Sequence, residues 1–110
     1  MQHPIDNIIF HNNVTSPNTG LEYMINGGGS IINIEFETTG TFSATFEAKV
    51  NINSTIWKPI SAGNLDTLNL SKIANDKNAI YQVDVTAISL FRVRLSEVNG
   101  ATTVYGKYVS

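Results

Sequence analysis

The stretch that decides the fold is residues 41–50, which read Thr-Phe-Ser-Ala-Thr-Phe-Glu-Ala-Lys-Val. Apolar residues occupy every second position from Phe42 to Val50, and the positions between them are mostly polar. This alternation is typical of a half-buried antiparallel strand, because successive side chains of a strand point to opposite faces of its sheet. A helix would scatter these five apolar residues around its circumference. The stretch therefore predicts a β-strand.

The same pattern continues on both sides of this strand. Alternation predicts further strands over residues 32–36, 81–85, 91–95 and 102–109, and weaker ones over 5–10, 21–25, 55–60 and 67–70. Thr38-Thr39-Gly40 and Asn99-Gly100 are short glycine-containing connections of the kind that joins hairpins. About eight short strands with such connections are typical of an all-β, antiparallel β-sandwich, either jelly-roll or Ig-like in strand order.

Composition agrees with this fold and excludes several functions. Asn, Thr and Ser together supply 33 of the 110 residues, and these residue types favour turns and strand edges over helix interiors. The absence of cysteine excludes disulfides, thiol nucleophiles and thiolate metal sites. A net charge of −2 offers no basic surface for nucleic acid. No apolar run exceeds three residues, so we expect neither a signal peptide nor a membrane partner.

Residues 1–20 differ in composition from the rest of the chain. They hold two of the three prolines and both histidines. We therefore expect an N-terminal arm over residues 1–20, a candidate docking extension, followed by one β-sandwich domain over residues 21–110. Gly27-Gly28-Gly29-Ser30 is expected to form a wide, flexible loop.

Few residues suit catalysis. His3, Asp6 and His11 could contribute to a metal site, but exposed polar residues on an arm explain them better. Paired carboxylates are needed for glycoside hydrolysis. The candidates lie on alternating positions that we expect to share one solvated sheet face, and they are Glu35, Glu37 and Glu47. We expect a protein that is not an enzyme, with no catalytic residues, no metal and no cofactor.

Two groups of residues are candidates for binding. Arg92 and Arg94 form the one basic cluster, which could contact an acidic neighbouring subunit. If a tight hairpin joins residues 81–85 to 91–95, Arg92 instead pairs across it with Asp84, and Arg94 with Gln82. Three aromatic side chains are candidates for stacking on sugars, and they are Trp57, Tyr105 and Tyr108. For Trp57 we favour packing in the core, because a tryptophan buries a large apolar surface.

At the level of motifs, the chain resembles a small β-sandwich module of structural proteins from tailed bacteriophages and prophages. In that module a Gly-Thr-Phe strand precedes a strand that contains Trp, and a Tyr-x-Val-Asp-Val segment leads into an Arg-x-Arg strand. The matching segments occur here in the same order over residues 21–110, as residues 40–48, 57–60, 81–88, 91–94 and 103–106.

The resemblance implies a virion component of the tail, neck, fibre-associated or head-decoration type. Such a protein is made in the cytoplasm of the bacterial host and acts in assembly or decoration of the particle through protein–protein contacts. Its partners would be copies of itself, in a homo-oligomer, and other virion proteins. The alternative is a module that resembles carbohydrate-binding domains and recognises host surface glycans.

Overall fold

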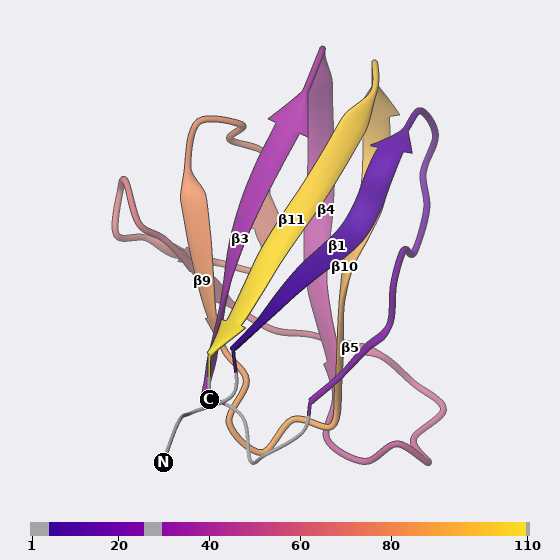
Figure 1. Ribbon diagram of the computed structural model, residues 1–110, viewed down its shortest axis with the longest axis vertical. Coiled ribbons are helices and arrows are strands. Elements are labelled where there is room, and N and C mark those ends of the chain that lie inside the picture. Colours follow the sequence, from indigo (N-terminus) through magenta and orange to yellow (C-terminus); the bar gives the residue numbers. More distant parts are fainter. Residues whose placement is uncertain (1–4, 26–29, 110) are drawn as a thin grey trace.

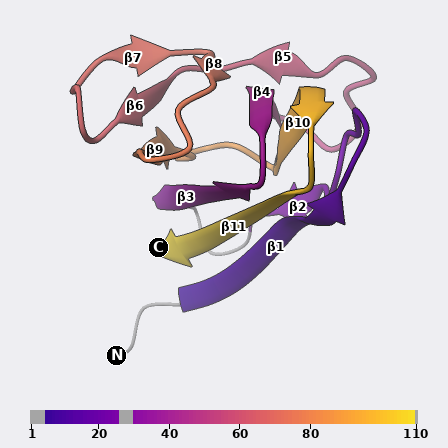
Figure 2. The ribbon, with the colours of Figure 1, turned by 90° about the horizontal axis from the view of Figure 1, so that it is seen from above.

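The computed structural model describes residues 5–25 and 30–109, and these residues form two antiparallel β-sheets packed face to face (Figures 1 and 2). Sheet A has the strand order β1-β11-β3-β9-β6-β7, with bounds Ile5–Val14, Thr102–Val109, Ile31–Thr38, Ile80–Asp84, Ala62–Asn64 and Leu70–Ser71. Sheet B has the order β2-β10-β4-β5, with bounds Tyr23–Met24, Leu90–Asn99, Thr41–Lys49 and Lys58–Pro59, and β8 (Ile73–Ala74) also pairs with β4. The predicted antiparallel β-sandwich is confirmed. The described residues form eleven strands instead of about eight, because both sheets include short strands of only two or three residues each.

The core forms between the two sheets from the alternate residues that the sequence pattern marks as apolar. Its largest fully buried side chains include Phe46 and Phe91, whose rings stack with centroids 6.5 Å apart. Phe36 of sheet A and Phe42 of sheet B also stack, at 4.4 Å. Val50 departs from the predicted pattern, because β4 ends at Lys49 and the Val50 side chain is 71 % exposed.

Two connections that the sequence predicts as hairpins are instead corners at which the chain passes from one sheet to the other. β3 and β11 pair in sheet A, whereas their continuations β4 and β10 pair in sheet B. The corners lie side by side: the Thr39 N–H donates to the Ala101 carbonyl at 3.0 Å, and the Ala101 N–H donates to Thr39 Oγ1 at 2.9 Å. Two long antiparallel strands therefore bend together, and this double corner joins the two sheets.

The N-terminal segment is part of the sandwich from residue 5 onward. β1 pairs with β11 along sheet A, and Ile8 and Phe10 are buried in the core. The connection from β1 to β2 is tied to sheet B, because Asn18 and Leu95 exchange two backbone hydrogen bonds of 3.0 and 2.9 Å. The expected division between a loosely docked arm and a domain at residue 20 is therefore wrong, because apolar side chains on β1 complete the core. The expected glycine loop at residues 27–29 lies outside the described residues.

Gly106 on β11 makes room for the Phe10 ring. A Cβ added at Gly106 would lie 2.5 Å from Phe10 Cε2. We expect Gly106→Ala to lower the free energy of unfolding by about 2 kcal/mol, because extra atoms in a packed core force side chains and backbone to shift. Denaturant unfolding of Gly106→Ala, Phe10→Leu and the double variant measures this effect. The double variant should be more stable than the sum of the two single losses predicts, and strictly additive losses would contradict the proposed contact.

Candidate functional site

The outer face of sheet B carries a cluster of charged residues held by one carboxylate. Register places Arg92 of β10 directly opposite Glu47 of β4. Arg92 Nε donates to Glu47 Oε1 at 2.9 Å, and Arg94 Nε lies 3.2 Å from Glu47 Oε2. The Glu47 and Arg92 side chains are 10 % and 13 % exposed, whereas that of Arg94 is 37 % exposed. Glu47 therefore holds both guanidinium groups in place, and Arg94 remains the more accessible of the two.

Trp57 belongs to this cluster and lies outside the core. The Arg92 guanidinium carbon lies 4.2 Å from the centroid of the Trp57 ring, and Lys49 Nζ lies 4.8 Å from it. Trp57 directly precedes β5, an edge strand that pairs with β4 through Glu47–Pro59 and Ala48–Lys58, so the ring lies at the edge of sheet B beside the cluster. The expected core position is therefore wrong. Cation–π attraction from two neighbouring side chains fixes this ring on the surface of sheet B.

The expected pairing of Arg92 with Asp84 and of Arg94 with Gln82 does not occur, because β9 and β10 lie in different sheets. The chain crosses between the sheets just after β9, with Ala87 at a φ of 62°. Asp84 is exposed and accepts a 2.9 Å hydrogen bond from the Thr86 N–H. Hydrogen bonds from the Thr86 backbone and side chain lower the pKa of Asp84 below its ordinary value.

The three candidate sugar-stacking residues do not form a common surface. Trp57 lies on the outer face of sheet B, and Tyr105 is 38 % exposed on the outer face of sheet A, opposite Ile9. Tyr108 is only 2 % exposed, and its ring lies 5.8 Å from that of Tyr23. Residues three apart on a strand point to opposite faces, which explains why Tyr105 and Tyr108 separate. No single sugar could stack on all three rings.

His11 is a buried structural residue. It is 3 % exposed, and its Nε2–H donates to the carbonyl oxygen of Val93 across the two sheets. The expectation of an exposed polar residue is therefore wrong for His11. His3, the other half of the weighed metal site, lies outside the described residues. Over residues 5–25 and 30–109, no three His, Cys, Asp or Glu side chains lie close enough together to hold a metal ion.

The pKa of His11 should make folding stability depend on pH. Burial lowers this pKa below its ordinary value of 6.5, although the hydrogen bond to Val93 opposes the shift. The unfolded chain therefore takes up the proton first as the pH falls below about 6.5, so the free energy of unfolding should decrease from there until the pKa of the folded protein is passed. His11→Gln should remove this part of the slope, which is at most about 1.4 kcal/mol per pH unit. Urea unfolding of both proteins between pH 7.5 and 5 measures it, and equal slopes would contradict the assignment.

The three glutamates weighed for glycoside hydrolysis are divided between the sheets. Glu35 and Glu37 are exposed on β3 of sheet A, whereas Glu47 is buried against two arginines on sheet B. The expectation of one shared face is therefore wrong for Glu47, because β3 and β4 are joined by a corner and not by a hairpin. Glu47 is therefore separated from the other two carboxylates and cannot pair with either of them in glycoside hydrolysis.

The fold and the surface together define the class of this protein, which is a small β-sandwich. Its distinctive features lie on its surface, and they are the cluster of Trp57 with basic side chains and the exposed apolar side chains. The described residues include no helix long and apolar enough to cross a membrane. The sequence model of the XepA family matches residues 4–108, and the chain belongs to this family.

Comparison with solved structures shows the same fold in two proteins. The first is the SPBc2 prophage-derived protein YomS, with a TM-score of 0.90, 21 % identity, and coverage of 100 % of this chain and 96 % of that one. The second is the PBSX exported protein XepA, with a TM-score of 0.91, 18 % identity and coverage of 100 % of this chain. The chain spans only 39 % of the length of XepA, so it corresponds in size to one part of that protein. No curated protein matches the chain.

Proposed function

We propose that this chain is a non-enzymatic bacteriophage structural protein that acts in assembly or decoration of the particle through protein–protein contacts, including contacts with its own copies. The observation that carries the proposal is membership of the XepA family together with the fold shared with a prophage-derived protein. The virion is the proposed location, after synthesis in the host cytoplasm.

The surface of the sandwich supports a role in binding. Large apolar side chains are exposed at several places, among them Ile56, Leu68 and Leu70, which are 66 %, 80 % and 76 % exposed. Exposed apolar side chains gathered in patches are typical of surfaces that contact other proteins. The Trp57 cluster adds an aromatic ring and a partly exposed arginine, which are residue types enriched at protein interfaces.

Fractionation of phage particles tests the proposal. Particles are purified by density gradient from a host that expresses the tagged protein during phage production. We expect the protein to sediment with the particles and to stay bound through washing. If the protein remains in the supernatant while particle yield and infectivity are unchanged by deleting its gene, the structural role is wrong.

A further inference from the structure

The outer face of sheet A combines an exposed aromatic ring with a row of side-chain amides. Backbone register aligns the outward-facing residues of β1, β11, β3 and β9 in rows that run across the strands. One row, which we call the aromatic row, consists of Ile9, Tyr105, Glu35 and Ile80. The next row, which we call the amide row, consists of Asn7, Lys107, Asn33 and Gln82. All of these residues are exposed or half-buried, and Figure 1 shows the four strands side by side with sheet B behind them.

An open hollow of about 250 Å³ lies between the two rows. Its floor is backbone, because the pair Gly106–Ile34 between the rows has no side chain that points outward. The volume is below the roughly 300–1,000 Å³ that is typical of pockets for larger ligands, so the hollow suits a single small ring. Its walls are side chains of both rows, and they are Tyr105, Glu35, Ile80, Asn7, Asn33 and Lys107.

Tyr105 is the candidate stacking residue whose ring remains available. Trp57 is already covered, because Arg92 and Lys49 place cationic groups 4.2 and 4.8 Å from the centroid of its ring. Tyr108 is buried. The Tyr105 side chain is 38 % exposed, and among the described residues no second aromatic ring and no cationic group stacks on it. The face of an aromatic ring is electron-rich, so it attracts C–H groups, whose hydrogens carry a small positive charge.

Two amides of the amide row hold each other in place and still offer hydrogen bonds to a ligand. Gln82 Nε2 donates to Asn33 Oδ1 at 3.0 Å, which orients both side chains. Within residues 5–25 and 30–109, no protein group bonds to Asn33 Nδ2 or to Gln82 Oε1, and neither atom is buried. One amide therefore presents a donor and its neighbour presents an acceptor. A hydroxyl group matches both, because it donates and accepts.

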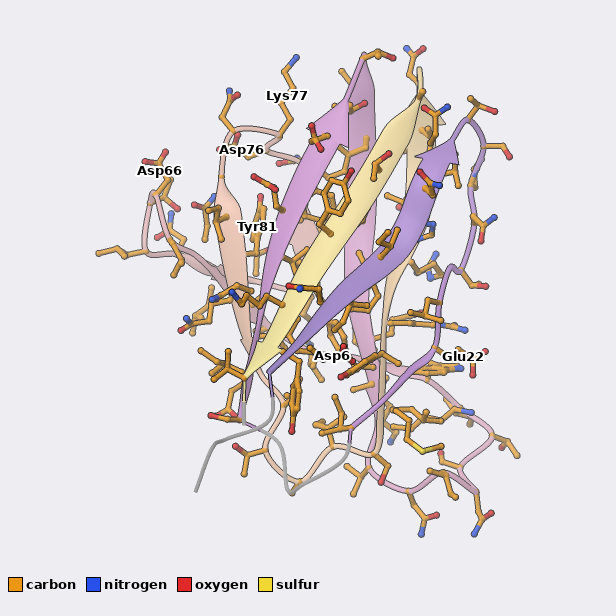
Figure 3. The ribbon with its side chains drawn as sticks, in the orientation of Figure 1. Asp6, Glu22, Asp66, Asp76, Lys77 and Tyr81 are labelled. Atoms are coloured by element: carbon orange, nitrogen blue, oxygen red, sulfur yellow. The ribbon has the colours of Figure 1, made fainter. Side chains whose placement is uncertain are left out.

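The charges on this face favour a neutral ligand. The two rows contain one carboxylate, that of Glu35, and one ammonium group, that of Lys107, so their charges cancel. Nucleic acid would need a basic surface. A protein partner would meet amides and charges where a stable interface has an apolar centre. Figure 3 shows several further charged side chains on either side of this area, with Glu22 beyond β1 and a group on the side of β9 that consists of Asp66, Asp76 and Lys77.

We propose that the outer face of sheet A binds a neutral glycan. One sugar ring lies in the hollow with its C–H face against Tyr105, and its hydroxyl groups bond to Asn33 Nδ2 and Gln82 Oε1. A sugar carries an apolar C–H face and several hydroxyl groups on one small ring, and the two rows offer a partner to each. This activity goes beyond the proposed structural role. Each copy carries a complete site, so binding does not depend on self-association, although copies held together would bind a polysaccharide more tightly.

Titration of the intact protein with neutral tetrasaccharides of glucose, galactose and N-acetylglucosamine tests the proposal. Nitrogen–proton correlation NMR spectra follow the titration, because they contain the side-chain amide signals of Asn33 and Gln82. We expect at least one of the three sugars to bind with a dissociation constant of about 1 mM, since an open site for one ring buries little surface. The signals that move should belong to β11, β3 and β9, with the two side-chain amides among them.

Four variants separate this site from the rest of the surface. Tyr105→Ala should weaken binding at least about tenfold because it removes the stacking surface, whereas Tyr105→Phe keeps the ring and should bind within about twofold of the wild type. Asn33→Ala removes the free donor and should weaken binding by about fivefold to tenfold. Trp57→Ala is the matched control, since it removes an aromatic ring from sheet B, and it should bind as the wild type does. Circular dichroism checks that each variant folds.

Three results would overturn the proposal. They are the absence of binding by all three sugars up to about 20 mM, binding that Trp57→Ala abolishes and Tyr105→Ala does not, and signal changes that lie outside sheet A. None of these results would affect the structural role, because sedimentation of the protein with phage particles is measured without any sugar. A protein that binds the sugars but stays in the supernatant would instead contradict the structural role and leave the glycan site in place.

Discussion

Replacing Gly40 with alanine should lower the free energy of unfolding by about 3 kcal/mol or more, near the upper end of what a single overpacking change costs. A Cβ at Gly40 would collide with the carbonyl oxygen of Asn99, well inside the 3.0 Å that real Cβ atoms keep from other atoms. The obstacle is backbone at the double corner, so no rotation of a side chain relieves it. A loss of this size corresponds to roughly 12–24 °C in the melting temperature of a domain near 100 residues.

Gly63→Ala is the matched control for this change. An added Cβ there would have its nearest neighbours at 3.7 and 3.9 Å, which is ordinary van der Waals contact. We expect Gly63→Ala to change stability by less than about 1 kcal/mol, with stabilisation as the more natural direction, because alanine restricts the unfolded chain. Thermal unfolding of both variants compares their melting temperatures. If Gly40→Ala melts as high as Gly63→Ala, the corners do not pack as described.

Glu47→Gln should cost about 2–3 kcal/mol, because it leaves two arginines beside a neutral side chain. Breaking a buried ion pair by removing one partner costs roughly 3–5 kcal/mol. We expect somewhat less here, since Arg94 is 37 % exposed and can regain solvent. Trp57 fluorescence should change as well, because Arg92 loses the carboxylate that holds it against the indole.

Glu37→Gln is the control, since it removes a carboxylate that is exposed on sheet A. Surface substitutions of this kind usually change stability by no more than about 0.5 kcal/mol. Urea unfolding followed by Trp57 fluorescence reports stability and environment together. Equal midpoints and equal spectra for the two variants would contradict the role of Glu47 as the anchor of the cluster.

The fold could be predicted from the sequence because alternation marks both the strands and the faces that they bury. The residues predicted to face inward on 32–36, 81–85 and 91–95 are buried. The pairing of strands could not be predicted in the same way. A short connection with glycine suits a hairpin and a corner equally well, and the choice depends on long-range partners: β3 pairs with β11, and β4 with β10.

The candidate site was predicted only in part, for the same reason. Alternation placed Arg92 and Arg94 together on an outer face, but their partner Glu47 lies 45 residues from Arg92 on a strand that a local pattern cannot identify. The separation of Tyr105 from Tyr108 was available from their odd spacing. The sequence could not predict the position of His11, because a histidine near a chain terminus is typical of an exposed residue or a metal ligand. In the structure its ring is buried, and the Val93 carbonyl accepts a hydrogen bond from its Nε2–H.

The mass of the wild-type protein in solution tests the central claim most directly. Light scattering after size exclusion, over a wide range of loading concentrations, compares the mass with the 12.0 kDa of one chain. A multiple of this value is the result that the proposed contacts between copies of the chain predict. A mass of 12.0 kDa at every concentration would contradict it.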